Sequence, residues 1–140
     1  MLKKIYQLLI VPYTLFLLYL MFLGMGRFQY EDNLITVEPI LSTIKYIQGV
    51  RYWRETVTVV LGNIVMFIPF GFLGWVFPKL KDLKPLFIHF VAAITIVEAL
   101  QYFTRLGIFE VDDIILNTFG VYLGWLLRRL MEKKFSDSVL

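Results

Sequence analysis

Long uncharged stretches alternate with short polar ones along this chain, and that alternation predicts its secondary structure. The first two stretches are 22 residues each and carry no charged side chain. The third contains one histidine and one glutamate, and the fourth has aspartates at its start and arginines near its end. Because about 20 apolar residues cross the hydrocarbon core of a bilayer, four transmembrane helices are predicted. They cover about residues 5–26, 56–77, 85–104 and 112–130.

The polar segment between the first two stretches contains a shorter amphipathic pattern. Apolar side chains fall at helical spacing over residues 40–47, after Pro39 and before Gly49. This pattern is typical of a short helix lying in the membrane interface. The sequence has no internal repeat or flexible linker. We therefore predict an all-α fold, a four-helix transmembrane bundle with a short interfacial helix in the first extracytoplasmic loop, as one domain over residues 1–140.

Composition supports a membrane protein. The chain is 59% hydrophobic, whereas a soluble domain averages about 45–50% apolar residues. It has no cysteine, which excludes disulfides, thiolate metal sites and cysteine nucleophiles. The net charge of +3 comes without a basic face or RNA-binding motif, so we expect no nucleic-acid partner. The first apolar stretch is longer than the core of a signal peptide, so we expect a retained anchor.

The basic residues predict the orientation. With four spans both termini share one side, and nine of the 14 basic residues fall there. They are Lys3, Lys4, Lys79, Lys81, Lys84, Arg128, Arg129, Lys133 and Lys134. The positive-inside rule therefore places both termini in the cytoplasm of a multi-pass protein of the bacterial inner membrane. We expect these basic segments to lie on anionic headgroups.

Polar residues gather near the opposite end of the predicted bundle. Glu98, Gln101 and Arg105 share one face of the third span by their i, i+3, i+7 spacing. Asp113 and Asn117 form a stripe on the fourth. Ionisable groups at such depth are costly in lipid, so they normally face protein or water and mark a site.

Three spans thereby bring polar groups to one level below the outer surface, because Asn63 of the second span lies at a similar depth. The candidate ligand-binding residues are Arg27, Asn63, Glu98, Gln101, Arg105, Asp112, Asp113 and Asn117. We expect no resident metal or cofactor.

Small residues and one proline bear on how these spans pack. The glycines predicted to let backbones approach closely are Gly62, Gly71, Gly74, Gly120 and Gly124. Pro69 lacks the N–H that its helix needs, so we expect a kink there and a free Val65 carbonyl facing the bundle.

Three motifs in order, N-x5-PFG from Asn63, E-x2-Q from Glu98 and DD-x3-N-x2-G from Asp112, resemble the VanZ-like family of small bacterial membrane proteins. Arg27 matches an arginine that members carry after the first helix. The resemblance implies a membrane protein that contributes to lower susceptibility to the glycopeptide teicoplanin, as the family's namesake does. It also implies that the site residues in these motifs share a role.

Three hypotheses for function stay open. The first is a binding module, in which arginines hold a phosphate or carboxylate and the deeper polar groups hold sugar, amide or amine groups. The ligand would be a membrane lipid, such as a lipid-linked cell-wall precursor, or a lipoglycopeptide.

The second hypothesis is a lipid-phosphate-processing enzyme, with Glu98, Asp112 and Asp113 holding Mg²⁺ or Ca²⁺, or with Glu98 as a general acid or base. The lack of cysteine and the single histidine on the other side argue against it. The third is a structural or regulatory subunit. In that case Asn63 and Asn117 clamp helices, Glu98 and Arg105 form an ion pair, and the aspartates stabilise a helix start. Homo-oligomers are compatible with all three.

Overall fold

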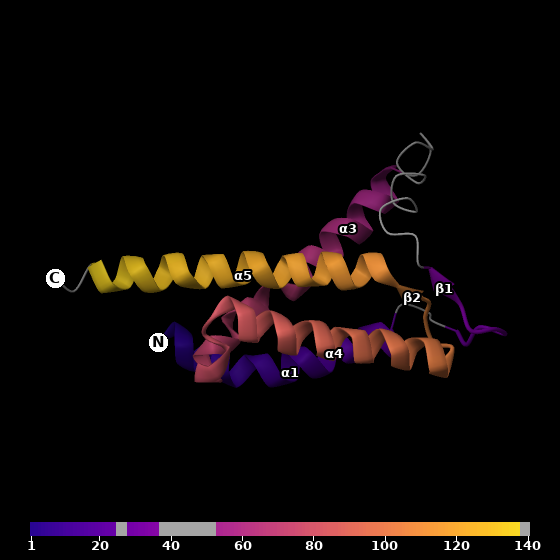
Figure 1. Cartoon of the computed structure of the whole chain (residues 1–140), viewed down its shortest axis with the longest axis horizontal. Coiled ribbons are helices and arrows are strands. Elements are labelled where there is room, and N and C mark those ends of the chain that lie inside the picture. Colours follow the sequence, from indigo (N-terminus) through magenta and orange to yellow (C-terminus); the bar gives the residue numbers. More distant parts are fainter. Residues whose placement is uncertain (25–27, 37–52, 138–140) are drawn as a thin grey trace.

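The computed structural model describes residues 1–24, 28–36 and 53–137, which form long helices and one short pair of strands (Figure 1). The elements are α1 (Leu2–Phe22), β1 (Ile35–Thr36), α3 (Trp53–Phe67), η1 (Ile68–Trp75), η2 (Pro78–Leu80), α4 (Leu83–Thr104), β2 (Phe109–Glu110) and α5 (Val111–Asp137). The predicted all-α fold is confirmed. The predicted interfacial helix at 40–47, and Arg27, lie outside the described residues.

Three of the described helical segments are long and apolar enough to cross a membrane. They are Leu2–Phe22, Val57–Trp75 and Leu83–Thr104. The fourth helix, α5, begins where predicted but continues beyond residue 130 to Asp137. No glycine or proline follows Gly124, and the added turns consist largely of good helix formers, so nothing local ends the helix earlier.

The second predicted span changes helix type at Pro69. The α-helix α3 ends at Phe67, and residues 68–75 continue as the 3₁₀ helix η1. Since Pro69 has no N–H to donate, the regular hydrogen-bond ladder is interrupted there. The Met66 carbonyl accepts a hydrogen bond from the Tyr13 hydroxyl at 2.6 Å, and the Pro69 carbonyl accepts one from the Tyr6 hydroxyl at 2.9 Å. Backbone carbonyls at and near the proline thus attach both α3 and η1 to α1.

Glycines bring α5 against α3 and η1 at backbone distance. A Cβ atom at Gly120 or Gly124 would collide with the carbonyl oxygen of Ile64 or Ile68. Gly71 lies against the α5 backbone in the same way, whereas Gly74 faces the Arg128 side chain and the Lys81 backbone. The expectation of close approach is wrong for Gly62, where the nearest such contact is a Met66 side chain at 3.9 Å.

Leu2–Phe22 is the least buried of the three candidate spans, with only Ile10 and Leu17 buried on it. The core is made mainly by α3, η1, α4 and α5, with Phe67, Leu86 and Val121 in it, and Leu17 of α1 joins it. The N-terminus and the C-terminal end of α5 lie at the same end of the molecule (Figure 1).

At the other end, residues 28–36 are attached to the turn between α4 and α5. β1 pairs in parallel with β2, with Ile35 opposite Phe109 and Thr36 opposite Glu110. The Tyr30 amide also donates to the Arg105 carbonyl at 2.9 Å. The helical periodicity of the sequence gave no sign of this short strand pair, which holds residues 28–36 against the segment between α4 and α5.

Candidate functional site

The site is built on the buried face of α4. Leu86, Phe90 and Ile94 form an apolar stripe at i, i+4 spacing, and the next positions on the same face are Glu98 and Gln101. Glu98 is 1% exposed and Gln101 is 4% exposed. The buried stripe therefore changes from apolar to polar toward the β1–β2 end of the molecule.

Two hydrogen bonds join helices to one another near the β1–β2 end of the molecule. The Asn63 side-chain amide of α3 donates to Asp113 Oδ1 of α5 at 2.6 Å. The Gln101 amide of α4 donates to the Met21 carbonyl of α1 at 2.8 Å. These bonds join α3 to α5 and α4 to α1, and the prediction that separate helices contribute polar groups to one layer stays a prediction. We call Asn63, Glu98, Gln101, Asp113 and Asn117 the polar layer.

Glu98 and Asn117 are the most deeply buried members of the polar layer. Glu98 Oε2 accepts a hydrogen bond from the Glu110 backbone N–H at 3.4 Å, which connects α4 to β2. Asn117 is 1% exposed, and its Oδ1 atom has no hydrogen-bond partner among the described residues. A buried amide oxygen without a partner costs about 1–3 kcal/mol, so this acceptor is an unusual feature of the layer.

The remaining predicted residues lie around this layer. Asp112 and Asp113 occupy the first turn of α5, where the helix dipole favours negative charge. Arg105 is exposed and ends α4 in a left-handed conformation, with φ 58°. Its guanidinium donates to the Glu31 carbonyl at 2.8 Å instead of forming the ion pair considered for Glu98. Across residues 1–24, 28–36 and 53–137, no three histidine or acidic side chains converge as metal ligands.

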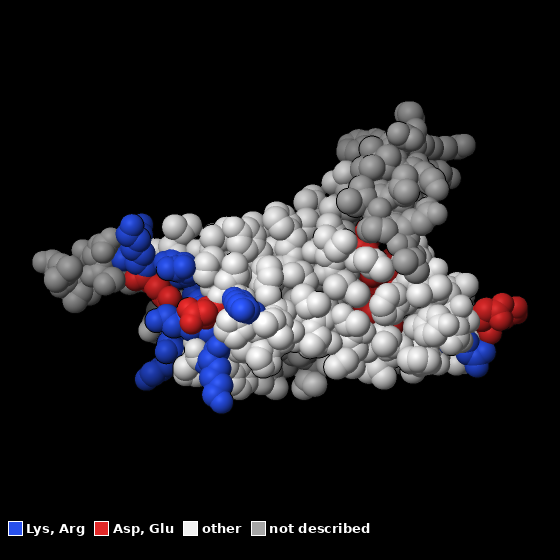
Figure 2. Space-filling view, viewed as in Figure 1, with Lys and Arg blue, Asp and Glu red and all other residues white. Residues whose placement is uncertain are grey.

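Basic side chains are unevenly distributed along the molecule. Most visible lysines and arginines gather, with some acidic side chains among them, at the end where the termini lie, and further acidic side chains are visible in a recess toward the other end (Figure 2). The acidic residues on elements at that end are Glu98, Glu110, Asp112 and Asp113. The polar layer thus lies at the opposite end from most of the visible basic residues.

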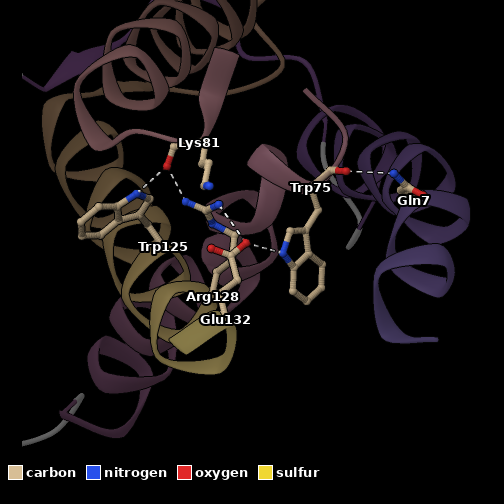
Figure 3. Close-up of polar contacts among 6 residues, drawn as sticks. All are labelled: Gln7, Trp75, Lys81, Trp125, Arg128 and Glu132. Atoms are coloured by element: carbon tan, nitrogen blue, oxygen red, sulfur yellow. Dashed lines mark hydrogen bonds and ion pairs between the residues drawn. The ribbon is translucent and has the colours of Figure 1, made fainter. Parts of the chain in front are cut away.

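Sequence reasoning missed a second polar group, built around buried Arg128 at the basic end (Figure 3). It consists of Gln7, Trp75, Lys81, Trp125, Arg128 and Glu132, which we call the Arg128 cluster. The expectation that Arg128 lies on headgroups is wrong, because its side chain is 1% exposed. The i, i+4 spacing of Arg128 and Glu132, which form an ion pair at 3.3 Å, was the signal that could have found it.

The hydrogen bonds of the Arg128 cluster join four parts of the chain. The Arg128 Nη2 and Trp125 Nε1 atoms both donate to the Lys81 carbonyl, the latter at 3.1 Å. Glu132 Oε1 also accepts from Trp75 Nε1 at 2.8 Å. The Gln7 amide of α1 donates to the Trp75 carbonyl at 2.8 Å. The cluster therefore attaches α5 to η1 and to the turn before α4.

The molecule also contains an apolar groove of about 440 Å³ between α1, η1 and α4. Met21 and Val97 line one end of it, next to Gln101 and Glu98 of the polar layer. Leu80 of η2 lines it toward the basic end. The groove and the polar layer are therefore neighbours along the same wall of α4.

Known proteins with similar sequences support the resemblance in the motifs. The family model described as VanZ/LLP1 matches residues 10–132, so the similarity extends beyond the three motifs to the first helix and its loop. Protein VanZ of Enterococcus faecium is 27% identical over 113 residues, which is 81% of this chain and 63% of that protein. The chain thus spans about 63% of the length of this curated relative. No solved structure shows significant similarity to the chain.

Proposed function

This chain belongs to the VanZ/LLP1 family, and from that premise we propose that its polar layer binds the polar part of an envelope lipid or a lipoglycopeptide. By this binding it contributes to teicoplanin-type glycopeptide resistance. The observation that carries the proposal is Asn117, whose buried Oδ1 has no partner within a layer supplied by three helices.

The chemistry of the polar layer suits hydroxyl, amide and amine groups. Asn117 offers an amide oxygen as acceptor, and the layer's carboxylates accept hydrogen bonds when ionised. Sugars, peptides and amino sugars supply the matching donors. In a site shielded from water such hydrogen bonds discriminate strongly, because a ligand lacking the donor leaves the protein group buried and unpaired.

The distribution of charge supports an orientation for this site. Basic residues concentrate at the end that carries both termini, and the positive-inside rule assigns that end to the cytoplasm. We propose that the protein spans the bacterial inner membrane with the polar layer near the outer face. There it would meet lipid-linked cell-wall precursors and glycopeptides.

Binding to protein in lipid nanodiscs tests the proposal. The ligands are teicoplanin and a polyprenyl-phosphate-linked cell-wall precursor, measured by calorimetry. We expect saturable binding that Asn117→Leu weakens about tenfold, since one lost hydrogen bond is worth about 1.4 kcal/mol. Thr118→Val is the matched control, because the Thr118 hydroxyl donates to the Ile114 carbonyl of its own helix. Absence of saturable binding by the unmodified protein would refute the proposal.

The structural alternative has its own supporting observation. The Asn63–Asp113 and Gln101–Met21 hydrogen bonds join α3 to α5 and α4 to α1, as a purely structural layer would. In that case Asn117→Leu should leave every ligand measurement unchanged, and the phenotype of polar-layer variants should follow their stability. A folded variant without resistance separates the two functions.

A further inference from the structure

The groove between α1 and α4 is lined almost entirely by hydrocarbon. Its lining residues are leucines, phenylalanines, other apolar residues, and two polar ones, Thr14 and His89. The Thr14 hydroxyl donates to the Ile10 carbonyl at 2.7 Å, and His89 Nδ1 lies 2.7 Å from the Pro85 carbonyl. Both polar side chains are thus engaged within their own helices. The groove therefore suits a hydrocarbon chain and provides no charged group for a headgroup.

The shape of the groove indicates what can fill it. Its α4 wall extends over residues 86–97, which is roughly 16 Å at 1.5 Å rise per residue. This elongated space of about 440 Å³ lies between apolar side chains of α1, η1 and α4. An extended hydrocarbon chain matches both its length and its lining, so we take a single alkyl chain as its occupant.

The surroundings of the groove supply such chains. α1 and α4 are both long and apolar enough to cross a membrane, so the space between them faces acyl chains. Two of the lining residues, His89 and Ala93, are exposed, which shows that the groove reaches the surface of the protein. A lipid can therefore enter sideways from the bilayer without passing through water.

The ends of the groove give a bound chain a direction. Near the polar layer, Gln101 donates to the carbonyl of Met21, a lining residue, so this hydrogen bond bridges α1 and α4 at that end. Val97 is followed directly by buried Glu98. A chain lying in the groove would therefore have its polar end beside the polar layer.

We infer that this groove binds one hydrocarbon chain of a membrane lipid, with the polar end of the same lipid next to Glu98 and Gln101. The inference rests on the proposed function for what happens at the polar end. The chain site itself follows from the volume, lining and position of the groove. On this inference, the fit of the hydrocarbon chain between α1 and α4 selects the lipid whose polar end reaches the polar layer.

Two neighbouring alanines provide a matched test. Ala93 lines the groove, whereas Ala92 is exposed and is not part of its lining. The protein is placed in nanodiscs of phosphatidylglycerol and phosphatidylethanolamine with a phosphatidylglycerol that carries a diazirine on its acyl chain. After illumination, adducts are mapped by mass spectrometry. We expect labelling of residues 14–21 and 86–97 that saturates as the probe is increased, unlike labelling by surrounding bulk lipid.

Filling the groove should remove this labelling. Ala93→Leu should lower the saturable component about tenfold, because extra methyl groups in an occupied space are strongly unfavourable, whereas Ala92→Leu should leave it unchanged. Equal labelling of Ala93→Leu and the unmodified protein would overturn the inference. The inference would also be overturned if Ala93→Leu abolished dimers of the protein and left the lipid adducts in place. A second copy of the chain would then be the occupant of the groove.

A second arm separates this inference from the proposed function. The same labelling is repeated with a diazirine-bearing alkane that has no headgroup and with the Asn117→Leu variant. Saturable labelling in both, together with absent ligand binding by the unmodified protein, supports the groove and refutes the proposed function. Ligand binding that persists in Ala93→Leu, together with labelling that never saturates, refutes the groove and leaves the proposed function standing.

Discussion

Asn117 of the polar layer and Arg128 of the Arg128 cluster are each 1% exposed and lie at opposite ends of the same bundle, yet their hydrogen bonding differs. Both terminal nitrogens of the Arg128 guanidinium donate to groups of the chain itself, Glu132 and the Lys81 carbonyl, and its Nε is left without a partner among the described residues. Asn117 Oδ1, the acceptor atom of its amide, has no partner among those residues.

In the Arg128 cluster a charge is neutralised by Glu132, and the donors of two tryptophans are satisfied, so the cluster holds α5, η1 and the turn before α4 together as a clamp. Under the proposed function, a guest molecule would supply the donor that Asn117 Oδ1 lacks among the described residues and would offset the cost of burying it. Depth alone thus does not identify a functional residue.

The largest expected effect comes from breaking the clamp. Arg128→Ala leaves Glu132 without its ion-pair partner and the Lys81 carbonyl without one donor, so we expect a loss of about 3 kcal/mol in the free energy of unfolding. Denaturation in mixed detergent micelles measures it. Arg129→Ala is the matched control: Arg129 is exposed and stacks on Trp125 at 5.0 Å, so its removal should cost under about 1 kcal/mol. If both variants lost the same free energy of unfolding, buried Arg128 would contribute no more to stability than exposed Arg129.

A smaller effect is expected from the hydrogen bond that closes one side of the polar layer. Asn63→Ala and Asp113→Ala, alone and together, form a double-mutant cycle across the 2.6 Å bond. We expect a coupling free energy of about 1 kcal/mol, because side-chain hydrogen bonds between membrane helices reach at most about 1.7 kcal/mol. A coupling near zero would show that this pair does not connect α3 to α5.

Asn117→Leu tests directly whether Asn117, unlike Arg128, contributes little to stability. Because its Oδ1 has no partner to lose, the free energy of unfolding without ligand should change by less than about 1 kcal/mol. The same denaturation assay measures it, with ligand binding determined in parallel. Destabilisation as large as that of Arg128→Ala would place Asn117 among the structural residues.

The smallest effect is expected at Lys81. Arg128 and Trp125 bind its backbone carbonyl, and its side chain is exposed. Lys81→Ala should therefore change the free energy of unfolding by less than about 0.5 kcal/mol. A larger loss in the denaturation assay would mean that the ammonium group, and not the carbonyl, supports the cluster.

The hydrophobic pattern by itself determined the helices and their order. Apolar runs of membrane-spanning length must form helices, since every backbone polar group has to be satisfied within the segment. Helical periodicity also placed Glu98 and Gln101 on one face, and both are buried on α4. This prediction succeeded because it depends on spacing along a regular helix. Comparison of depths placed Asn63, Glu98 and Asn117 at one level, which stays a prediction.

Only the tertiary structure decided the rest. The sequence predicted Arg128 at the membrane surface and considered Arg105 as an ion-pair partner of Glu98, whereas the fold buries the former and exposes the latter. The β1–β2 pair, the tyrosine contacts to carbonyls near Pro69 and the α1–α4 groove likewise join residues far apart in the chain. Hydropathy records how apolar a residue is. Which partners neutralise a charge, and where a groove stays open, depend on how the helices pack.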